Sequence, residues 1–327
     1  MHPPADETPF RPLNRAYTSV FRPNRLSIGL VVPLDTYATG PVPTMARHGE
    51  RARLADDLGF AALWLRDVPF DVPGFGDAGQ VFDPFVYLGY LAARTERIAL
   101  GVASVILPLR HPAHVAKAAA SADVLSGGRM LLGIASGDRP EEFPALAMPY
   151  PDRGARFRDA YDYIRHMAED APVFANGYGA TGYGMDMLPK PTAARLPLLV
   201  TGGSQQDTDW IARHGDGWML YPRPAPLQAR IIADWRTRIA AAGGAAKPAM
   251  EPFYIDLAPD DDAPPRPIHL GLQLGMNTLR EYLTERRAIG VNHVALNLRF
   301  NRADIEATLH RLAHELLPDF HDGEPTP

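Results

Sequence analysis

The sequence predicts an α/β fold, a single (β/α)8 TIM barrel formed by one chain of 327 residues. Strand and helix signals alternate along the chain, and eight such pairs can be counted. The predicted strands are nearly continuous apolar runs, as expected for parallel strands that are buried on both faces. A series of βα units with buried strands is typical of a barrel. A doubly wound sheet is the alternative, but it usually needs fewer units.

The first four strand–helix pairs follow directly from apolar runs and helix-start signals. Residues 26–33 are apolar and β-branched and end near a proline, which indicates a buried strand. Thr44 is the predicted cap of a helix that Gly59 ends, and Asp83 caps a helix with Pro84 in its first turn. The remaining predicted elements here are strands 60–67, 97–108 and 129–136, helix 111–128, and a helix that begins near Arg153.

The second half of the chain repeats the pattern and adds insertions. Its predicted strands are 196–203, 216–222, 251–258 and 292–300, and its predicted helices are 204–215, 225–243, 277–290 and 301–317. Residues 137–152 lengthen the loop after the fourth strand, and residues 171–196 separate the fourth helix from the fifth strand. The second insertion is too long for an ordinary connection, so we expect a lid; a surface excursion without a role is the alternative.

The domain boundaries and composition narrow the class of protein. We expect an N-terminal extension at 1–25, one barrel domain at 26–320 and a C-terminal tail at 321–327. A net charge of −5 without a basic block argues against a nucleic-acid partner. The absence of cysteine excludes disulfides, thiolate metal sites and cysteine nucleophiles. No apolar stretch reaches the roughly 18 residues of a membrane span, and the N-terminus lacks a signal peptide's apolar segment, so we expect a cytoplasmic protein.

Catalytic groups of a barrel gather where its strands end. These positions hold Leu34, Asp35, Tyr37, Arg66, Asp67, Ser104, Arg110, His111, Ser136, Asp138, Arg139, Gly202, Gly203, Ser204, Tyr221, Arg223, Arg299 and Asn301. With one histidine, no cysteine and no tight carboxylate pair, this inventory predicts that a cofactor supplies the reactivity. His111 and His114 lie three residues apart, but Pro112 places them across a helix start, so we expect no metal site.

The turn after the fifth predicted strand is a candidate phosphate site. Gly202 and Gly203 allow close approach of the backbone, and the free N–H groups of a following helix favour an anion. The alternative is a capping box, in which Ser204 and Asp207 satisfy the same N–H groups internally. The residues of this turn alone leave both interpretations open.

Three segments, 95–143, 152–164 and 196–219, resemble the bacterial luciferase-like family of flavin-dependent monooxygenases and oxidoreductases. The strand "RIALGVASVILPLRHP" followed by "LSGGRMLLGIASG" carries most of the resemblance, which extends over about residues 26–318. The resemblance implies a barrel that binds FMN, or in some branches the deazaflavin F420, and that forms a homodimer. We therefore expect an FMN-dependent monooxygenase that uses reduced flavin and O2 on a small organic substrate, with a flavin reductase as a possible partner. An F420-dependent hydride transferase and a non-catalytic flavin-binding protein are the alternatives.

The resemblance also assigns residues. It implies a non-proline cis peptide bond at Ala103–Ser104 that supports the flavin ring, and it places Ser136, Gly137 and Asp138 at the ring edge and phosphate. The loop of Gly202, Gly203, Ser204, Gln205 and Gln206 corresponds to the family's phosphate loop. Ser136 stands where relatives carry arginine, so Arg139 or Arg153 is the expected substitute. The expected contacts with the ring or the substrate are Asp35, Tyr37, Arg66, Asp67 and His111. Our candidate catalytic residues are Asp35, Arg66, Asp67 and His111.

Overall fold

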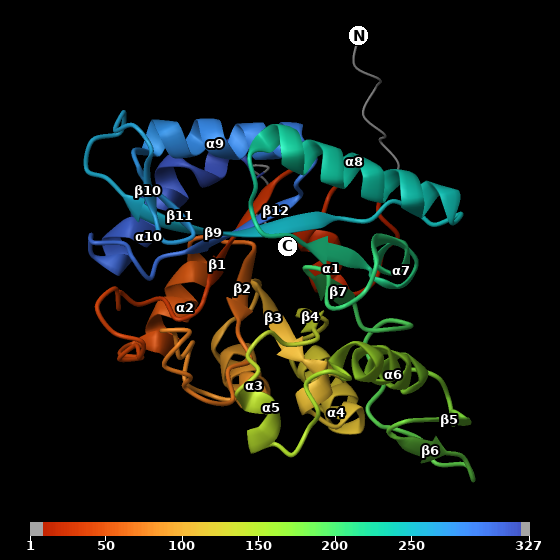
Figure 1. The fold of residues 1–327 in the computed structure, drawn as a ribbon. Helices are drawn as coiled ribbons and strands as arrows, with labels where there is room; N and C mark the ends of the chain where they lie inside the picture. The colour runs from red at the N-terminus through yellow and green to blue at the C-terminus, as the bar shows by residue number, and fades with distance from the viewer. Residues whose placement is uncertain (1–8, 322–327) are drawn as a thin grey trace.

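The protein is a closed barrel of eight parallel strands surrounded by helices (Figure 1), as the computed structural model of residues 9–321 shows. The barrel strands are β1 (Ser27–Val31), β2 (Ala62–Leu65), β3 (Ala99–Ile106), β4 (Met130–Ala135), β7 (Leu198–Thr201), β8 (Gly217–Met219), β9 (Ala249–Leu257) and β12 (His293–Asn297). Each pairs with its neighbour in parallel; β12 also pairs with β1, and β8 with β9, which closes the ring. The predicted TIM barrel is confirmed.

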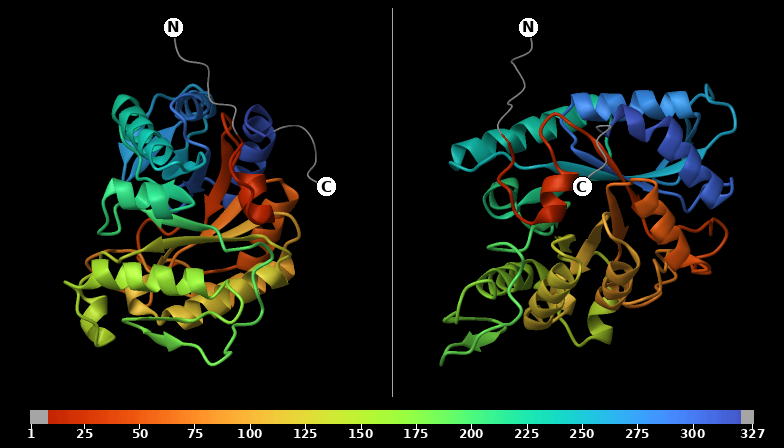
Figure 2. Two further views of the ribbon diagram at one scale, coloured as in Figure 1. Left: turned by 90° about the vertical axis from the view of Figure 1, so that its right-hand side faces the viewer. Right: turned by 180° about the vertical axis from the view of Figure 1, so that it is seen from behind.

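The helices that follow the strands lie outside the ring (Figure 2). They are α2 (His48–Asp57), α3 (Pro84–Arg94), α4 (Pro112–Leu125), α6 (Arg153–His166), α7 (Thr208–His214), α8 (Ala225–Ala241), α9 (Met276–Ala288) and α10 (Ile305–Glu315). Asp83 caps α3 as predicted, because its carboxylate accepts from the N–H groups of Phe85 and Val86. The predicted cap at Thr44 is wrong: α2 begins at His48, and the Thr44 hydroxyl instead hydrogen-bonds Asp35.

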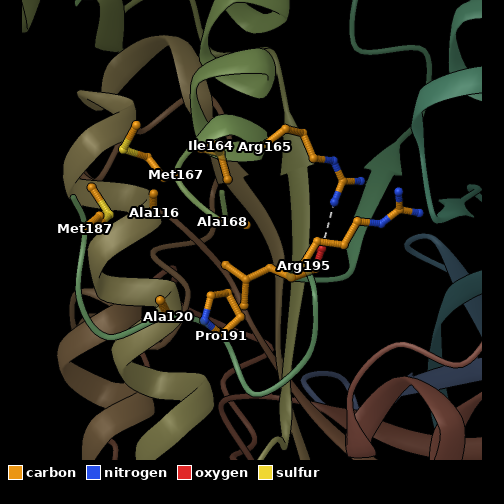
Figure 3. Close-up of a pocket in the computed structure, with 10 residues that line it drawn as sticks. Ala116, Ala120, Ile164, Arg165, Met167, Ala168, Met187, Pro191 and Arg195 are labelled. Carbon is orange, nitrogen blue, oxygen red and sulfur yellow. Dashed lines mark hydrogen bonds between the residues drawn. The ribbon is translucent and has the colours of Figure 1, made fainter. Parts of the chain in front are cut away.

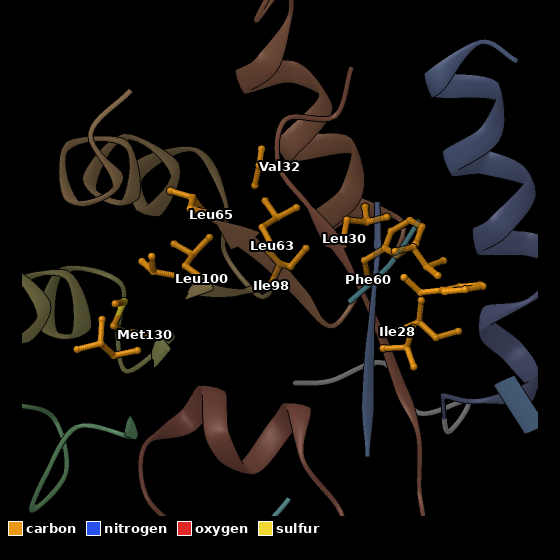
Figure 4. Close-up of a cluster of buried hydrophobic side chains, with 14 of the residues drawn as sticks. Ile28, Leu30, Val32, Phe60, Leu63, Leu65, Ile98, Leu100 and Met130 are labelled. Atoms are coloured by element: carbon orange, nitrogen blue, oxygen red, sulfur yellow. The ribbon is translucent and has the colours of Figure 1, made fainter. Parts of the chain in front are cut away.

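The core has two layers. The outer layer packs the strands against the helices, with Leu30, Leu63, Leu65 and Leu100 among its buried members (Figure 4). The inner layer fills the barrel itself, and its buried strand residues are Val31, Ala62, Trp64, Ala99, Leu131, Leu199, Met219, Met250 and Ala295. Alternate residues of each strand therefore face the two layers, which explains why the strands are apolar throughout.

A short N-terminal helix, α1 (Arg15–Val20), covers the amino-terminal end of the barrel. Tyr17 and Phe21 join the inner layer, and the Tyr17 hydroxyl donates to the carbonyl of Asp216, just before β8. The Ala16 N–H bonds the carbonyl of Gly128, just before β4. With this end covered, the carboxyl ends of the strands form the accessible face, which we call the mouth.

Several short elements lie outside the minimal barrel: α5 (Glu142–Ala145), the 3-10 turns η1 (Leu107–Leu109) and η2 (Leu317–Asp319), and strands β5 (Phe174–Asn176), β6 (Gly179–Thr181), β10 (Arg266–Ile268) and β11 (Gly271–Leu274). The sequence did not predict β10 and β11, which form a hairpin whose second strand pairs with the carboxyl half of β9.

The insertion 171–196 runs along the outside of α4 and α6. Its β5–β6 hairpin lies beside α6 (Figure 1), where the Asn176 amide donates to the carbonyl of Asp159. Two contacts hold the returning segment. The Lys117 ammonium donates to the Leu188 carbonyl, and the Asp123 carboxylate accepts from the N–H and the hydroxyl of Thr192. These contacts place the segment against helices, and its role as a lid stays a prediction.

Within residues 9–321, no helix is both long enough and apolar enough to cross a membrane.

Candidate cofactor and substrate site

The floor of the mouth is formed where β3, β7 and β8 end. The Ala103–Ser104 peptide bond is cis, as expected, and the pairing of β3 with β4 is interrupted between Val102 and Val105. The Ser104 hydroxyl hydrogen-bonds the Thr201 hydroxyl, which in turn lies 3.1 Å from the Met219 sulfur. Ser104 is buried, so the floor presents a small polar patch within an apolar surface.

The turn after β7 contains three residues with a left-handed backbone. Gly202, Ser204 and Gln205 have φ of +53°, +44° and +58°. The Ser204 hydroxyl donates to the carbonyl of Thr201 at 2.6 Å, and the Gln206 N–H bonds the carbonyl of Gly203 at 2.8 Å. Successive left-handed or turn residues direct neighbouring N–H groups to one side, which is how a backbone anion site is built.

Of the two interpretations of this turn, the structure does not have the capping box at Ser204. Helix α7 begins at Thr208, and its N-cap is Asp207, whose carboxylate accepts from the Trp210 N–H at 2.7 Å. The turn and the start of α7 are therefore separate, and the Ser204 hydroxyl bonds the Thr201 carbonyl within the turn. The carboxylate of Asp207 satisfies α7, so this helix end is not an anion site.

The start of α6, unlike that of α7, has no side-chain cap, so its N–H groups are candidates to bind an anion. Asp152 makes no side-chain cap hydrogen bond to α6. Gly154 lies against the phosphate-loop candidate so closely that an added Cβ would be 2.9 Å from the Cβ of Gln205. The Gln206 amide also donates to the Gly154 carbonyl at 2.9 Å. An uncapped 14-residue helix thus points its positive end at the turn after β7.

Of the two arginines expected to replace the family's charge, Arg153 lies at this junction. Its guanidinium stacks on Tyr150, 3.8 Å from the ring centroid, and its Nε is buried without a hydrogen-bond partner among the described residues. Arg139 is engaged elsewhere: it stacks on Phe75 at 4.6 Å and lies 3.7 Å from Glu142. Arg153 thus directly precedes Gly154, which contacts the loop 202–206, whereas the side chain of Arg139 lies against Phe75 and Glu142.

The expected ring-edge residues follow β4. Ser136 is buried, and Asp138 is exposed. Gly137 has φ +84°, and an added Cβ would be 2.8 Å from Ile106 and 3.1 Å from Phe143, so this position requires glycine.

Sequence reasoning missed Glu142. This carboxyl group is 2% exposed, and one of its oxygens has no hydrogen-bond partner in the described chain. Burial raises the pKa of Glu142 to about 7, with the charge of Arg139 opposing the rise and that of Asp67 adding to it. A carboxyl group with such a pKa can hold or release a proton at neutral pH. Its position in the insertion after β4, outside the strand-end inventory, gave no sequence signal.

The two candidate catalytic carboxylates, Asp35 and Asp67, hold loops in place. Asp67 accepts two hydrogen bonds from Arg110, at 2.6 and 2.9 Å, and one from the Ile106 N–H. Asp35 accepts from the Thr44 hydroxyl and N–H at 2.7 and 3.0 Å. Both carboxylates lie near the mouth, but their oxygens are committed to neighbouring loops.

His111 caps α4. Its Nδ1 accepts from the Ala113 N–H, and its Nε2 lies 3.2 Å from the carbonyl of Tyr178 in the β5–β6 turn. Both ring nitrogens are thus occupied, and the ring contacts Tyr163 of α6. His114 lies 6.0 Å away between centroids. Residues 9–321 contain no group of three or more His, Cys, Asp or Glu side chains placed to hold a metal ion.

Arg66 and Tyr37 meet at the mouth. The guanidinium of Arg66 makes two hydrogen bonds to Asp77, at 2.6 and 2.9 Å, and donates to the Tyr37 hydroxyl at 2.9 Å. Burial raises the pKa of Tyr37, so its phenol stays neutral. Asp77 was not predicted, because it lies in the middle of the loop that follows β2.

A small hollow lies elsewhere, between α4, α6 and the end of the insertion (Figure 3). It is lined by Ala116, Ala120, Ile164, Met167, Met187 and Pro191, with Arg165 and Arg195 at one side. The hollow is on the outer face of the barrel and holds none of the candidate site residues.

Comparison with known proteins identifies the family of the chain. The chain matches the family described as luciferase-like monooxygenase over residues 25–263. It is 28% identical over 226 residues to 4-hydroxyprotoasukamycin monooxygenase of Streptomyces nodosus subsp. asukaensis, covering 67% of this chain and 59% of that protein. It is 32% identical over 170 residues to the F420-dependent glucose-6-phosphate dehydrogenase of Beutenbergia cavernae, covering 51% and 49%.

A solved structure shares the fold. The monooxygenase RslO1 from Streptomyces bottropensis superposes with a TM-score of 0.75 at 22% identity, covering 90% of this chain and 99% of that one. Relatives of this chain include both monooxygenases and F420-dependent oxidoreductases. The chain belongs to the luciferase-like monooxygenase family, and it is an enzyme of that oxidoreductase class.

Proposed function

We propose that this enzyme is an FMN-dependent monooxygenase that uses reduced flavin and O2 to oxidise a small organic substrate. The observation that carries the proposal is the junction between the loop 202–206 and the uncapped start of α6, with Arg153 beside it. A turn with left-handed residues, a helix N-terminus and an arginine whose Nε lacks a hydrogen-bond partner among the described residues together fit a phosphate group. Membership of a monooxygenase family adds the reaction class.

Each part of the mouth has a role in this proposal. The N–H groups of Gly203 to Gln205 and of the first turn of α6 bind the phosphate, and Arg153 adds positive charge. Ser104, Thr201 and the cis bond before Ser104 form the floor that supports and orients the ring. Reduced flavin, when bound, would supply the electrons that reduce one oxygen atom of O2 to water while the other is transferred to the substrate.

Glu142 holds a proton near the reacting groups. Its pKa of about 7 leaves it partly protonated at neutral pH. Burial keeps water from its carboxyl group, and Arg139 lies close enough to stabilise the ionised form after proton release.

Hydride transfer with F420 is the second candidate, and the F420-dependent relatives favour it. The phosphate site serves either cofactor. We further propose that a separate reductase supplies reduced FMN, and that the enzyme works in the cytoplasm as a homodimer.

Cofactor titration tests the proposal. Purified protein is titrated with FMN, riboflavin and F420 and followed by quenching of cofactor fluorescence, and any copurifying flavin is identified by mass spectrometry. We expect micromolar FMN affinity that is at least about tenfold tighter than riboflavin affinity, the equivalent of about 1.4 kcal/mol from the phosphate. Tight binding of F420 with no binding of FMN would contradict the monooxygenase proposal and favour hydride transfer.

A further inference from the structure

The mouth contains a buried cluster of two arginines and one carboxylate, Arg66, Asp77 and Arg299. Arg66 follows β2, Arg299 follows β12, and Asp77 lies in the loop between β2 and α3. Arg66 binds both oxygens of Asp77, and Nη1 of Arg299 lies 2.9 Å from one of them. The side chains of Arg66, Asp77 and Arg299 are 17%, 9% and 9% exposed.

The cluster carries a net positive charge. Although burial opposes ionisation, the hydrogen bonds and charge of Arg66 hold the pKa of Asp77 below its usual value, so Asp77 is a carboxylate. Two guanidinium groups and one carboxylate leave one positive charge. Across residues 9–321, neither arginine forms an ion pair with any other carboxylate. A buried charge without a counter-charge is costly, and a bound anion would remove the cost.

Donors of the cluster are left over for such an anion. The Nε atoms of Arg66 and Arg299 are both buried and lack a hydrogen-bond partner in the part of the chain described here. Nη2 of Arg299 donates to the carbonyls of Gly40 and Gly76, which fixes the guanidinium in place. Fixed guanidinium groups are well suited to bind a planar or tetrahedral oxyanion.

Aromatic side chains flank the cluster. Phe300 packs 5.5 Å from Tyr254 between centroids, and the Arg299 guanidinium lies 5.1 Å from the Phe300 centroid and 4.6 Å from that of Tyr37. Tyr221, which follows β8, is 54% exposed. The surroundings of the positive charge are therefore suited to an organic molecule rather than to an inorganic ion.

We propose that the Arg66–Asp77–Arg299 cluster binds the negatively charged oxygen group of the substrate, and that the substrate is an organic anion with an apolar or aromatic body. This inference deepens the proposed function, since it assigns the substrate class of the same mouth. Carboxylates and sulfonates share the required chemistry. Binding at the cluster would place the apolar body of the substrate over the aromatic side chains and toward the floor at Ser104.

Binding of simple probes to the full-length protein tests the inference. Isothermal titration with benzoate, benzenesulfonate and the neutral benzamide is performed with and without FMN. We expect the anions to bind at least about tenfold more tightly than benzamide, and the two anions report which oxyanion geometry is preferred. Equal affinity for benzoate and benzamide in the native protein overturns the proposal, whatever the variants do.

Variants locate the binding. Arg299→Gln should weaken benzoate binding about tenfold or more, whereas Arg302→Gln is the matched control: this arginine is on the same loop, is 72% exposed, pairs with Asp256 and should have no effect. Asp77→Asn removes the internal counter-charge and should tighten benzoate binding. If the cluster only clamps loops, Asp77→Asn will weaken benzoate binding or leave it unchanged, and the proposal fails.

FMN titration of the same variants separates the two proposals. If FMN affinity is retained but benzoate binds no more tightly than benzamide, the proposed anion site is wrong and the proposed flavin function is unaffected. Loss of FMN affinity in Arg299→Gln, with benzoate binding unchanged, would assign the cluster to the cofactor and overturn this inference.

Discussion

Replacing Gly154 by alanine tests the phosphate site at its tightest contact. The new Cβ would lie 2.9 Å from the Cβ of Gln205, and ordinary contacts begin at 3.4 Å. The loop 202–206 must therefore move away from α6 by about 0.5 Å, which is comparable to the tolerance of a functional site. Displaced N–H donors should lower FMN affinity about tenfold, or about 1.4 kcal/mol. Riboflavin, which lacks the phosphate, should bind as before.

The matched control is Gly89→Ala in α3. No atom lies within 4 Å of its added Cβ, so the substitution should stabilise the helix by about 0.5–1 kcal/mol and leave FMN affinity unchanged. Fluorescence titrations with both flavins and thermal unfolding of both variants complete the assay. Unchanged FMN affinity in Gly154→Ala, or an equal loss for FMN and riboflavin, would refute the placement of the phosphate between α6 and the turn.

Three further predictions concern single residues. Glu142→Gln should abolish an inflection near pH 7 in the pH profile of turnover while FMN affinity is retained; an inflection that persists would assign the proton to another group. Burial raises the pKa of Glu251 to about 7 from 4.5, so its contribution to stability is present below pH 4.5 and lost as the pH rises through 7. In denaturant unfolding, the free energy of unfolding of Glu251→Gln should accordingly exceed that of the native protein by up to about 3 kcal/mol at pH 8 and by nothing at pH 4.5. Parallel curves of the free energy of unfolding against pH for the two proteins would contradict this. His293 accepts a hydrogen bond from Trp64 at 2.8 Å, and burial lowers the pKa of His293 to about 3. The contribution of neutral His293 to the free energy of unfolding is therefore present above pH 6.5 and is lost as the pH falls toward 3, at up to about 1.4 kcal/mol per pH unit. In the same measurement, the free energy of unfolding of His293→Asn should fall less steeply with decreasing pH.

The barrel could be predicted from the sequence because its determinants are local. Apolar runs such as residues 97–108 predict buried parallel strands, and a capping residue such as Asp83 marks a helix start regardless of distant contacts. Where local signals compete, the sequence left two interpretations open. Ser204 is a suitable cap by residue type, but the left-handed backbone of the turn directs its hydroxyl to the Thr201 carbonyl, and α7 starts at Asp207 instead.

The insertions show a second limit. The segment 266–274 places Ile268, Leu270, Leu272 and Leu274 at every second position, but Pro267 and Gly271 interrupt the pattern and it was not predicted as a strand; β11 forms because the carboxyl half of β9 offers it unpaired backbone groups. Glu142 likewise became a candidate only through burial, which sets its pKa and depends on the folding of α5 over the mouth.

By itself the sequence determined the fold class, the absence of cysteine chemistry and, through its family resemblance, the cis bond at Ala103–Ser104. Only the tertiary structure decided which side chains share the mouth. It brought the start of α6 against Gln205, and it joined Arg66 and Arg299 on Asp77, from opposite ends of the chain. The physical reason is that charge and hydrogen-bond partners are set by distance in space, and closing the barrel places the first and last strands side by side.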